Sequence, residues 1–280
     1  MNTQVHPIRP GSLTELSLAP AHPLERNATL RRARGQNFVV DWIEGTAGAS
    51  FVSNSSGETM LIAADSEGAV LQHAGSEITM PGRTIAILPA GETVIGFGEK
   101  ATLIRLSRAN MLADGVDPAN AAEYASPDAA VAAPGKPAAS RESGIRLHSI
   151  DALKAPADKP RLKMLRSADI SINWVEYHGL RDRKALSPHD HADFEQGSLA
   201  IAGNFLHHLR VPWGPDATQW QDDRHVEAPP SSLMVIPPRV IHTTEGLGEG
   251  HHILLDVFCP PRADFLAKGW IANDSAYAPC

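Results

Sequence analysis

The chain has 280 residues and a formal net charge of −7, with 42% hydrophobic and 20% charged residues. This composition is typical of a folded globular protein and argues against intrinsic disorder. The acidic balance, without any basic stripe, argues against nucleic acid as a partner. The apolar runs are too short to span a bilayer, and the N-terminus lacks the pattern of a secretory signal. We therefore expect a soluble cytoplasmic protein whose two cysteines, Cys259 and Cys280, are not bridged.

Short strand patterns occupy two stretches of the chain. Between residues 38 and 107, brief segments rich in β-branched residues are bounded by Gly, Pro, Ser or Asn, and similar segments return after residue 145. Such spacing predicts an all-β fold of sandwich or barrel type. The Ala- and Pro-rich residues 109–144 have no such pattern and are interpreted as a linker. The predicted domains are therefore 1–108 and 145–280.

The two halves resemble diverged copies of one unit. Residues 85–106, IAILPAGETVIGFGEKATLIRL, and residues 233–257, LMVIPPRVIHTTEGLGEGHHILLDV, share one order of features. Each has an apolar strand, a Pro, a turn, a Gly-x-Gly-Glu tip and a second apolar strand. Self-similarity of this kind indicates two tandem β units.

A group of histidines in the second half has the spacing of a metal site. On a regular strand, His189, His191 and Glu195 face the same side because they stand at i, i+2 and i+6. A later strand and Pro turn lead to His242, and pairing of the two strands brings it to the same place. Three imidazoles and one carboxylate suit a divalent metal and leave two octahedral positions open. The alternatives are surface histidines at a loop mouth and a purely structural metal site.

This order of residues resembles the two signature motifs of the cupin superfamily. The pattern is HxHxxxE, about fifty residues, then a strand, a Pro and a final His. The resemblance covers residues 146–262 well and residues 35–107 more weakly, so the chain resembles a bicupin. It implies two antiparallel β-barrels of the double-stranded β-helix type, with a metal inside the second. Two departures stand out: Arg239 occupies a usual glycine position, and the glycine after the motif falls one place late, at Gly203.

Four further residues are candidates for the substrate pocket. Trp174 and His178 stand four apart on the strand before the motif, so they share a face and could line the cavity, with core packing as the equal alternative. Of the adjacent His207 and His208 only one can reach the pocket, because they face opposite sides, and His208 is the candidate. Arg239 could bind a substrate carboxylate through its guanidinium fork.

The N-terminal copy lacks the histidines. Glu58 stands where the second copy has Glu195, and counting back gives Asn54 and Val52 where that copy has imidazoles. Val94 takes the place of the final His. We therefore predict a first barrel that is filled by its own side chains and holds no metal.

The function expected from these features is that of a metal-dependent enzyme. Its substrate would be a small polar or aromatic acid, and its reaction a dioxygenase-type oxidation. Fe, Mn, Zn and Ni are not distinguished by the ligands. An isomerase, lyase or hydrolase acting on a sugar or keto acid is the alternative, as is a non-catalytic ligand-binding protein. We expect a small-molecule substrate, no nucleic acid, no membrane, and a possible homodimer.

Overall fold

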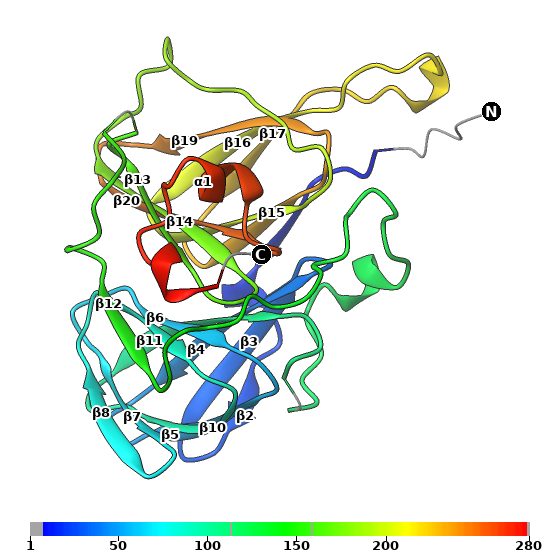
Figure 1. The fold of residues 1–280 in the computed structure, drawn as a ribbon. Helices are drawn as coiled ribbons and strands as arrows, with labels where there is room; N and C mark the ends of the chain where they lie inside the picture. The colour runs from blue at the N-terminus through cyan, green and yellow to red at the C-terminus, as the bar shows by residue number, and fades with distance from the viewer. Residues whose placement is uncertain (1–7, 113, 158, 279–280) are drawn as a thin grey trace.

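The fold of the first half is a pair of antiparallel sheets. The computed structural model describes residues 8–112, 114–157 and 159–278 (Figure 1). Within these residues, the large sheet of the first unit has seven strands and the small sheet has four. The large sheet contains β2 (His22–Leu24), β3 (Ala28–Arg34), β4 (Phe38–Gly45), β6 (Thr59–Ala63), β9 (Thr84–Leu88), β11 (Ala101–Arg108) and β12 (Arg146–Ser149). The small sheet contains β5 (Ser50–Ser55), β7 (Ala69–His73), β8 (Ser76–Met80) and β10 (Gly91–Gly96).

The second unit repeats this plan and lies above the first in Figure 1. Its large sheet contains β1 (Ser12–Glu15), β13 (Leu162–Arg166), β14 (Ser171–His178), β15 (Gln196–Ala202), β18 (Ser232–Ile236) and β20 (His251–Phe258). Its small sheet contains β16 (Asn204–Arg210), β17 (Arg224–Ala228) and β19 (Ile241–Leu247). The helical turns are short: η1 (Leu16–Leu18), η2 (Ala121–Tyr124), η3 (Ala217–Gln219), α1 (Ala263–Ala267) and η4 (Asp274–Ala276). The predicted all-β class is confirmed.

The two units exchange strands. β1 pairs with β18 of the second unit, with Leu13 opposite Met234. β12 pairs with β9 of the first unit, with Leu147 opposite Ala86. Each large sheet therefore contains one strand from the sequence range of the other unit. The sheets do not follow the domain ranges 1–108 and 145–280 that were expected from the sequence.

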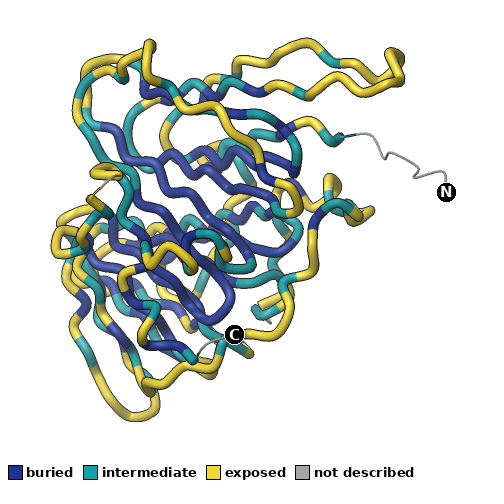
Figure 2. The backbone as a smooth tube through the Cα atoms, turned by 45° about the horizontal axis from the view of Figure 1, so that its top comes forward, coloured by how far each residue is buried: buried dark blue, intermediate teal, exposed yellow. Residues whose placement is uncertain are grey.

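The largest apolar core lies between the two large sheets (Figure 2). Alternate residues of the central strands point into it, because successive side chains of a strand face opposite sides. The first unit contributes Val40, Met60, Ile62, Ile85, Ile87, Ile104 and Leu106, and the second contributes Ile172, Trp174, Leu199, Leu233, Val235, Leu255 and Val257. The first unit thus covers most of one face of the sheet whose other face lines the second barrel.

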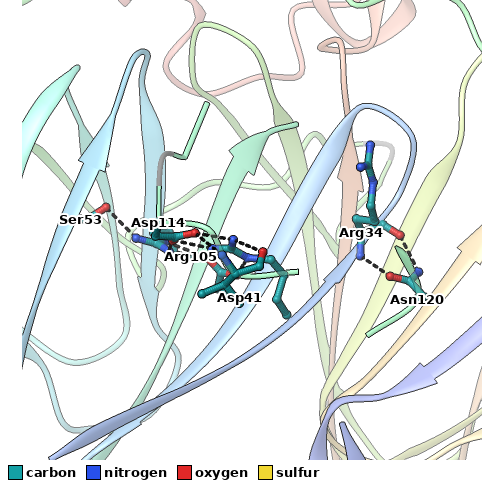
Figure 3. Close-up of polar contacts among 8 residues, drawn as sticks. Arg34, Asp41, Ser53, Arg105, Asp114 and Asn120 are labelled. Atoms are coloured by element: carbon teal, nitrogen blue, oxygen red, sulfur yellow. Dashed lines mark hydrogen bonds and ion pairs between the residues drawn. The ribbon is translucent and has the colours of Figure 1, made fainter. Parts of the chain in front are cut away.

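The interior of the first barrel holds apolar side chains and a buried ion network. Arg32 and Arg105 both bind the carboxylate of Asp41, at 2.6 Å and 2.7 Å. Asp114 closes the network from the segment after β11, at 2.7 Å from Arg32, and Ser53 accepts from Arg105 (Figure 3). Each buried charge has an opposite partner, which is the condition for keeping ions inside a protein.

The residues of β5 and β10 that the sequence matched to the metal ligands do not face the interior of the first barrel, because the inward residues are one position away. Val52 and Asn54 are exposed, and Val94 lies opposite Val52 on the outer side of the small sheet. The inward residues are their neighbours Phe51 and Ser53, which are buried. A shift of one residue exchanges the two faces of a strand, and this overturns the positional match made from the sequence.

Residues 109–144 pack against both units. Asn120 exchanges two hydrogen bonds with the backbone of Arg34, at 3.0 Å and 2.8 Å (Figure 3). Further along, the backbone N–H of Ala132 donates to the carbonyl of Asp193, at 2.7 Å. This segment therefore reaches the loop that carries the histidine motif.

Two further expectations concern the cysteines and membranes. Cys259 is buried and free, whereas Cys280 lies outside the described residues. Among the described helices, none has the length and apolar character needed to cross a bilayer.

Candidate metal centre

Three histidines of the second unit converge at the rim of its barrel. One ring nitrogen each from His189, His191 and His242 lies within 4.8 Å of the others. Their backbones fix this arrangement, since His189 and His242 exchange N–H···O bonds of 3.1 Å and 2.8 Å. His191 and His242 are buried, whereas His189 is exposed. The cluster therefore opens to solvent on the His189 side.

Backbone carbonyls determine which nitrogen of two of these rings is free. The Nδ1 of His189 lies 2.9 Å from the carbonyl oxygen of Ser187, and the Nδ1 of His242 lies 2.9 Å from that of Val240. A carbonyl oxygen only accepts, so each Nδ1 carries the proton and each Nε2 keeps its lone pair. This is the arrangement in which imidazoles bind metals.

The amide oxygen of a glutamine lies beside two of the histidines. The Oε1 of Gln196 lies 3.0 Å from His191 Nε2 and 3.4 Å from His242 Nε2. Its Nε2 donates to Ser198 Oγ at 2.9 Å and to Asp256 Oδ1 at 3.0 Å. Because Asp256 accepts, it holds the amide nitrogen on its own side and turns the amide oxygen toward the histidines.

Asp256 is itself fixed by its neighbours in the sheet. Ser198 Oγ donates to its Oδ1 at 2.7 Å, and Asn173 Nδ2 donates to its Oδ2 at 3.1 Å. Ser198 and Asn173 stand directly opposite Asp256 on the two adjacent strands. The register of β14, β20 and β15 therefore builds the support behind Gln196.

Glu195, the carboxylate expected at the site, does not lie with the histidines. Its Oε2 accepts the backbone N–H of Gln36, at 2.5 Å, and burial raises the pKa of Glu195 to about 7. The chain bends at Ala192 and Asp193, so residues 189–195 are not the regular strand that the same-face argument requires.

The displaced glycine of the motif was the signal for Gln196. Gly203 has a φ of +78°, and a Cβ there would lie 2.7 Å from the ring of His252. Glycine is therefore required at this position. Gly203 falls one residue later than the motif places its glycine. If the fourth ligand is also one residue later, it is Gln196 instead of Glu195.

Arg239 adopts the backbone conformation of the glycine that it replaces. Its φ is +67°, a region that side chains rarely occupy. Its backbone N–H donates to the carbonyl of His191, at 2.6 Å, so the residue fixes the histidine loop through its main chain. Its side-chain Nε is buried and has no hydrogen-bond partner among the described residues.

Of the other predicted pocket residues, Trp174 and His178 lie away from the histidine cluster, whereas His208 lines a pocket beside it. Trp174 is fully buried in the core between the large sheets, and His178 on the same face is exposed and stacks on His251. His208 faces away from the barrel interior, contacts Glu245 at 2.9 Å, and lines a pocket of about 420 Å³ together with Pro188 and His242. The inward residue of the pair is His207, which is fully buried. For Trp174 and His178 the face that they share packs against the first unit rather than lining the barrel.

Burial keeps the two buried site histidines, His191 and His242, neutral. It lowers the pKa of His191 to about 3 and that of His242 to about 4, and the positive charge of Arg262 acts in the same direction. The guanidinium of Arg262 lies 3.8 Å from the ring centroid of Phe265 and pairs with Asp264 at 2.6 Å. Neutral imidazoles are the form that binds metal. No sequence pattern had pointed to Arg262.

These donors fit a divalent transition metal. Two imidazoles present free Nε2 atoms, His191 completes the cluster, and one amide oxygen faces it. Imidazole nitrogen suits Fe, Cu, Zn and Ni, and oxygen ligands extend the range to Mn. The set does not choose one metal.

The architecture and the position of the histidines define a cupin fold. No protein-family model and no curated protein matches the sequence. The similarity is therefore one of structure, and it extends over both β units. The predicted cupin fold is confirmed.

Three solved structures illustrate the likeness. The oxalate decarboxylase of Lactobacillus farciminis, in its formate complex, has a TM-score of 0.62 at 14% identity, over 92% of this chain and 88% of that one. Protein Ylba from E. coli has a TM-score of 0.61 at 10% identity, over 90% and 91%. The oxalate decarboxylase of Bacillus subtilis, which has Mn(II) centres, has a TM-score of 0.59 at 11% identity, over 89% and 77%.

Proposed function

We propose that the chain is a metal-dependent enzyme that acts on a small carboxylic acid at the second barrel. The observation that supports it is the convergence of three imidazoles and one amide oxygen at a rim that opens to solvent. His189, His191, His242 and Gln196 would hold one divalent ion. When bound, this ion supplies positive charge and open coordination positions for an acidic substrate.

The surrounding residues orient the four donors. Asp256 fixes the amide of Gln196, and the carbonyls of Ser187 and Val240 fix two of the rings. The shared core behind the barrel keeps water away from the closed side. The open side at His189 is where a substrate enters.

A dioxygenase-type oxidation is the reaction that we favour. Among the described residues, the cluster of potential ligands contains only imidazoles. The carboxylate of Glu195 accepts a hydrogen bond from the backbone of Gln36. The carboxylate of Asp256 accepts hydrogen bonds from Gln196, Ser198 and Asn173. Within the described part of the chain, the two carboxylates closest in sequence or contact to this site are thus engaged elsewhere, which favours oxygen chemistry over acid–base chemistry.

A lyase is the second candidate. It is supported by the fold similarity to an oxalate decarboxylase over 92% of the chain. A decarboxylase of this kind would release CO₂ from a small dicarboxylic acid, and manganese would be its candidate metal.

Metal analysis and gas exchange test both candidates. Protein purified without added metal is analysed for Fe, Mn, Zn and Ni, and is then supplied with a panel of small polar and aromatic acids, oxalate included. Oxygen uptake that requires the metal supports the dioxygenase, whereas CO₂ release without net oxygen uptake supports the lyase. A His242→Ala variant that folds and keeps full turnover would contradict both.

We further propose that the partner of this site is a small molecule rather than a macromolecule, and that the metal-loaded chain can form a homodimer. Sedimentation of the purified protein measures the second point.

A further inference from the structure

A fourth imidazole lies inside the second barrel. His207 stands on β16 directly opposite Thr244 of β19, and two residues further on Leu209 stands opposite His242. Residues paired across antiparallel strands share a face, so His207 and His242 point to the same side. Two residues along a strand correspond to roughly 7 Å. His207 is therefore one step deeper in the barrel than the metal site.

One nitrogen of His207 is left unpaired. Its Nδ1 lies 2.8 Å from the hydroxyl of Thr244, whereas its Nε2 is buried without a hydrogen-bond partner among the described residues. A buried polar atom of this kind costs about 1–3 kcal/mol if it stays unpaired. By contrast, the amide of Gln196 and the carboxylate of Asp256 have partners at both of their polar atoms.

Two adjacent strands of the large sheet, β14 and β20, also carry buried polar atoms that have no hydrogen-bond partner among the described residues. Asn173 Oδ1 on β14 and His252 Nδ1 on β20 are also buried and unpaired. His252 contacts Phe205, which stands two residues before His207, with ring centroids 5.5 Å apart. The strands that line the barrel therefore carry buried polar atoms without partners at more than one level, which favours a polar ligand over a purely apolar core.

We propose that His207 contacts the substrate, with its Nε2 hydrogen-bonded to an oxygen of a small acid whose carboxylate is held at the histidine cluster. This role rests on the function proposed above. It selects acids that carry a second oxygen near the carboxylate, such as 2-oxo, 2-hydroxy or dicarboxylic acids. An acid without that oxygen leaves the imidazole unpaired, and binding sites built for a hydrogen bond discriminate strongly against such analogues.

Binding of oxalate and pyruvate to the zinc-loaded protein tests this role. Calorimetry is carried out on the wild type, on His207→Leu and on His148→Leu, the matched control whose Nε2 is also buried without a hydrogen-bond partner among the described residues but which lies on β12, paired with the first unit. His207→Leu should bind the acids about tenfold more weakly, the loss expected for one hydrogen bond. His148→Leu should remain within about twofold of the wild type. Elemental analysis should find one zinc per chain in all three proteins.

Nuclear magnetic resonance of ¹⁵N-histidine-labelled wild-type protein gives a second measurement that does not depend on the variant folding. The ring signals of His207 should shift when oxalate or pyruvate binds, while those of His148 should not. Unchanged affinity in a zinc-loaded His207→Leu would overturn the inference, as would bound acid that leaves the His207 signals in place. Zinc-loaded wild type that binds neither acid also overturns it but leaves the metal function standing. A wild type that binds no divalent metal contradicts the proposed function itself.

Discussion

Gln196 and Glu195 show how one place in the chain changes the chemistry of a site. The spacing of His189, His191 and His242 was sufficient to predict their convergence, because it depends on one short loop and one strand pair. The fourth donor depends on a bend at residues 192–193, which the sequence pattern does not reveal. The late glycine at Gly203 carried that information.

Metal affinity distinguishes the two candidate donors. Replacing Gln196 by Leu removes the amide oxygen, so the affinity for Zn²⁺ or Mn²⁺ should fall at least about tenfold, the range seen when groups around a metal are lost. Glu195→Gln should change it by less than about threefold, because that side chain binds Gln36. Competition with a chromophoric chelator measures both. A larger loss in Glu195→Gln than in Gln196→Leu would restore the carboxylate as ligand.

The pH dependence of stability reports on Glu195 in metal-free protein. Its pKa is raised to about 7 in the fold, above its ordinary value near 4.5, so the folded chain binds more protons than the unfolded chain between these pH values. The wild type should therefore lose stability through this group as pH rises from about 4.5 to about 7. Glu195→Gln lacks this loss, so its stability relative to the wild type should rise by up to about 3 kcal/mol over the window.

Denaturant titrations at several pH values measure that difference, since the other titrating groups are common to both proteins. A difference that stays flat across the window would show that Glu195 is ionised in the fold.

At the scale of elements, the strands were predictable but their exchange was not. Local patterns of β-branched residues and turns mark each strand, whereas pairing of β1 with β18 joins residues more than two hundred positions apart. A strand pattern does not name its partner. A strand pattern also does not show which of its two faces points inward. His208 was therefore expected to face the barrel interior, whereas the structure has His207 there.

Leu16, the first residue after β1, allows the strand exchange to be tested by mutation. Leu16 is fully buried in the core between the sheets, and its N–H donates to the carbonyl of Ser231 at 2.8 Å. Leu16→Ala should lower the free energy of unfolding by about 2–5 kcal/mol. Leu18→Ala is the matched control in the same helical turn, since Leu18 is 78% exposed, and should change it by less than about 0.5 kcal/mol. Equal effects in chemical denaturation would show that β1 is not held by the second unit.

For the whole molecule, the difference between the two barrels predicts the number of metal ions: the second unit carries the histidine cluster. The first interior is occupied by apolar side chains and by the ion network of Arg32, Asp41, Arg105 and Asp114. We expect one ion per chain, lost in His189→Ala. Two ions that persist in that variant would place a metal in the first barrel.

The shared core and exchanged strands predict that the two units do not separate. A protease site inserted between Gly135 and Lys136, both exposed, should be cleaved without dissociation of the fragments. Size-exclusion chromatography of the cleaved protein under native conditions measures this. Fragments that elute apart and keep their structure would show that the units fold independently.

The pairing of β1 with β18 also has a consequence for biosynthesis. Residues 12–15 are synthesised more than two hundred residues before their partner strand at residues 232–235. At about 5–20 residues per second, the interval lasts from about ten seconds to well over half a minute. During that time the β1 segment remains without its partner strand, and the first unit also lacks β12 until about residue 149 has emerged. The large sheet of the first unit can therefore be completed once β12 has emerged, whereas that of the second unit cannot be completed before β20 has been made.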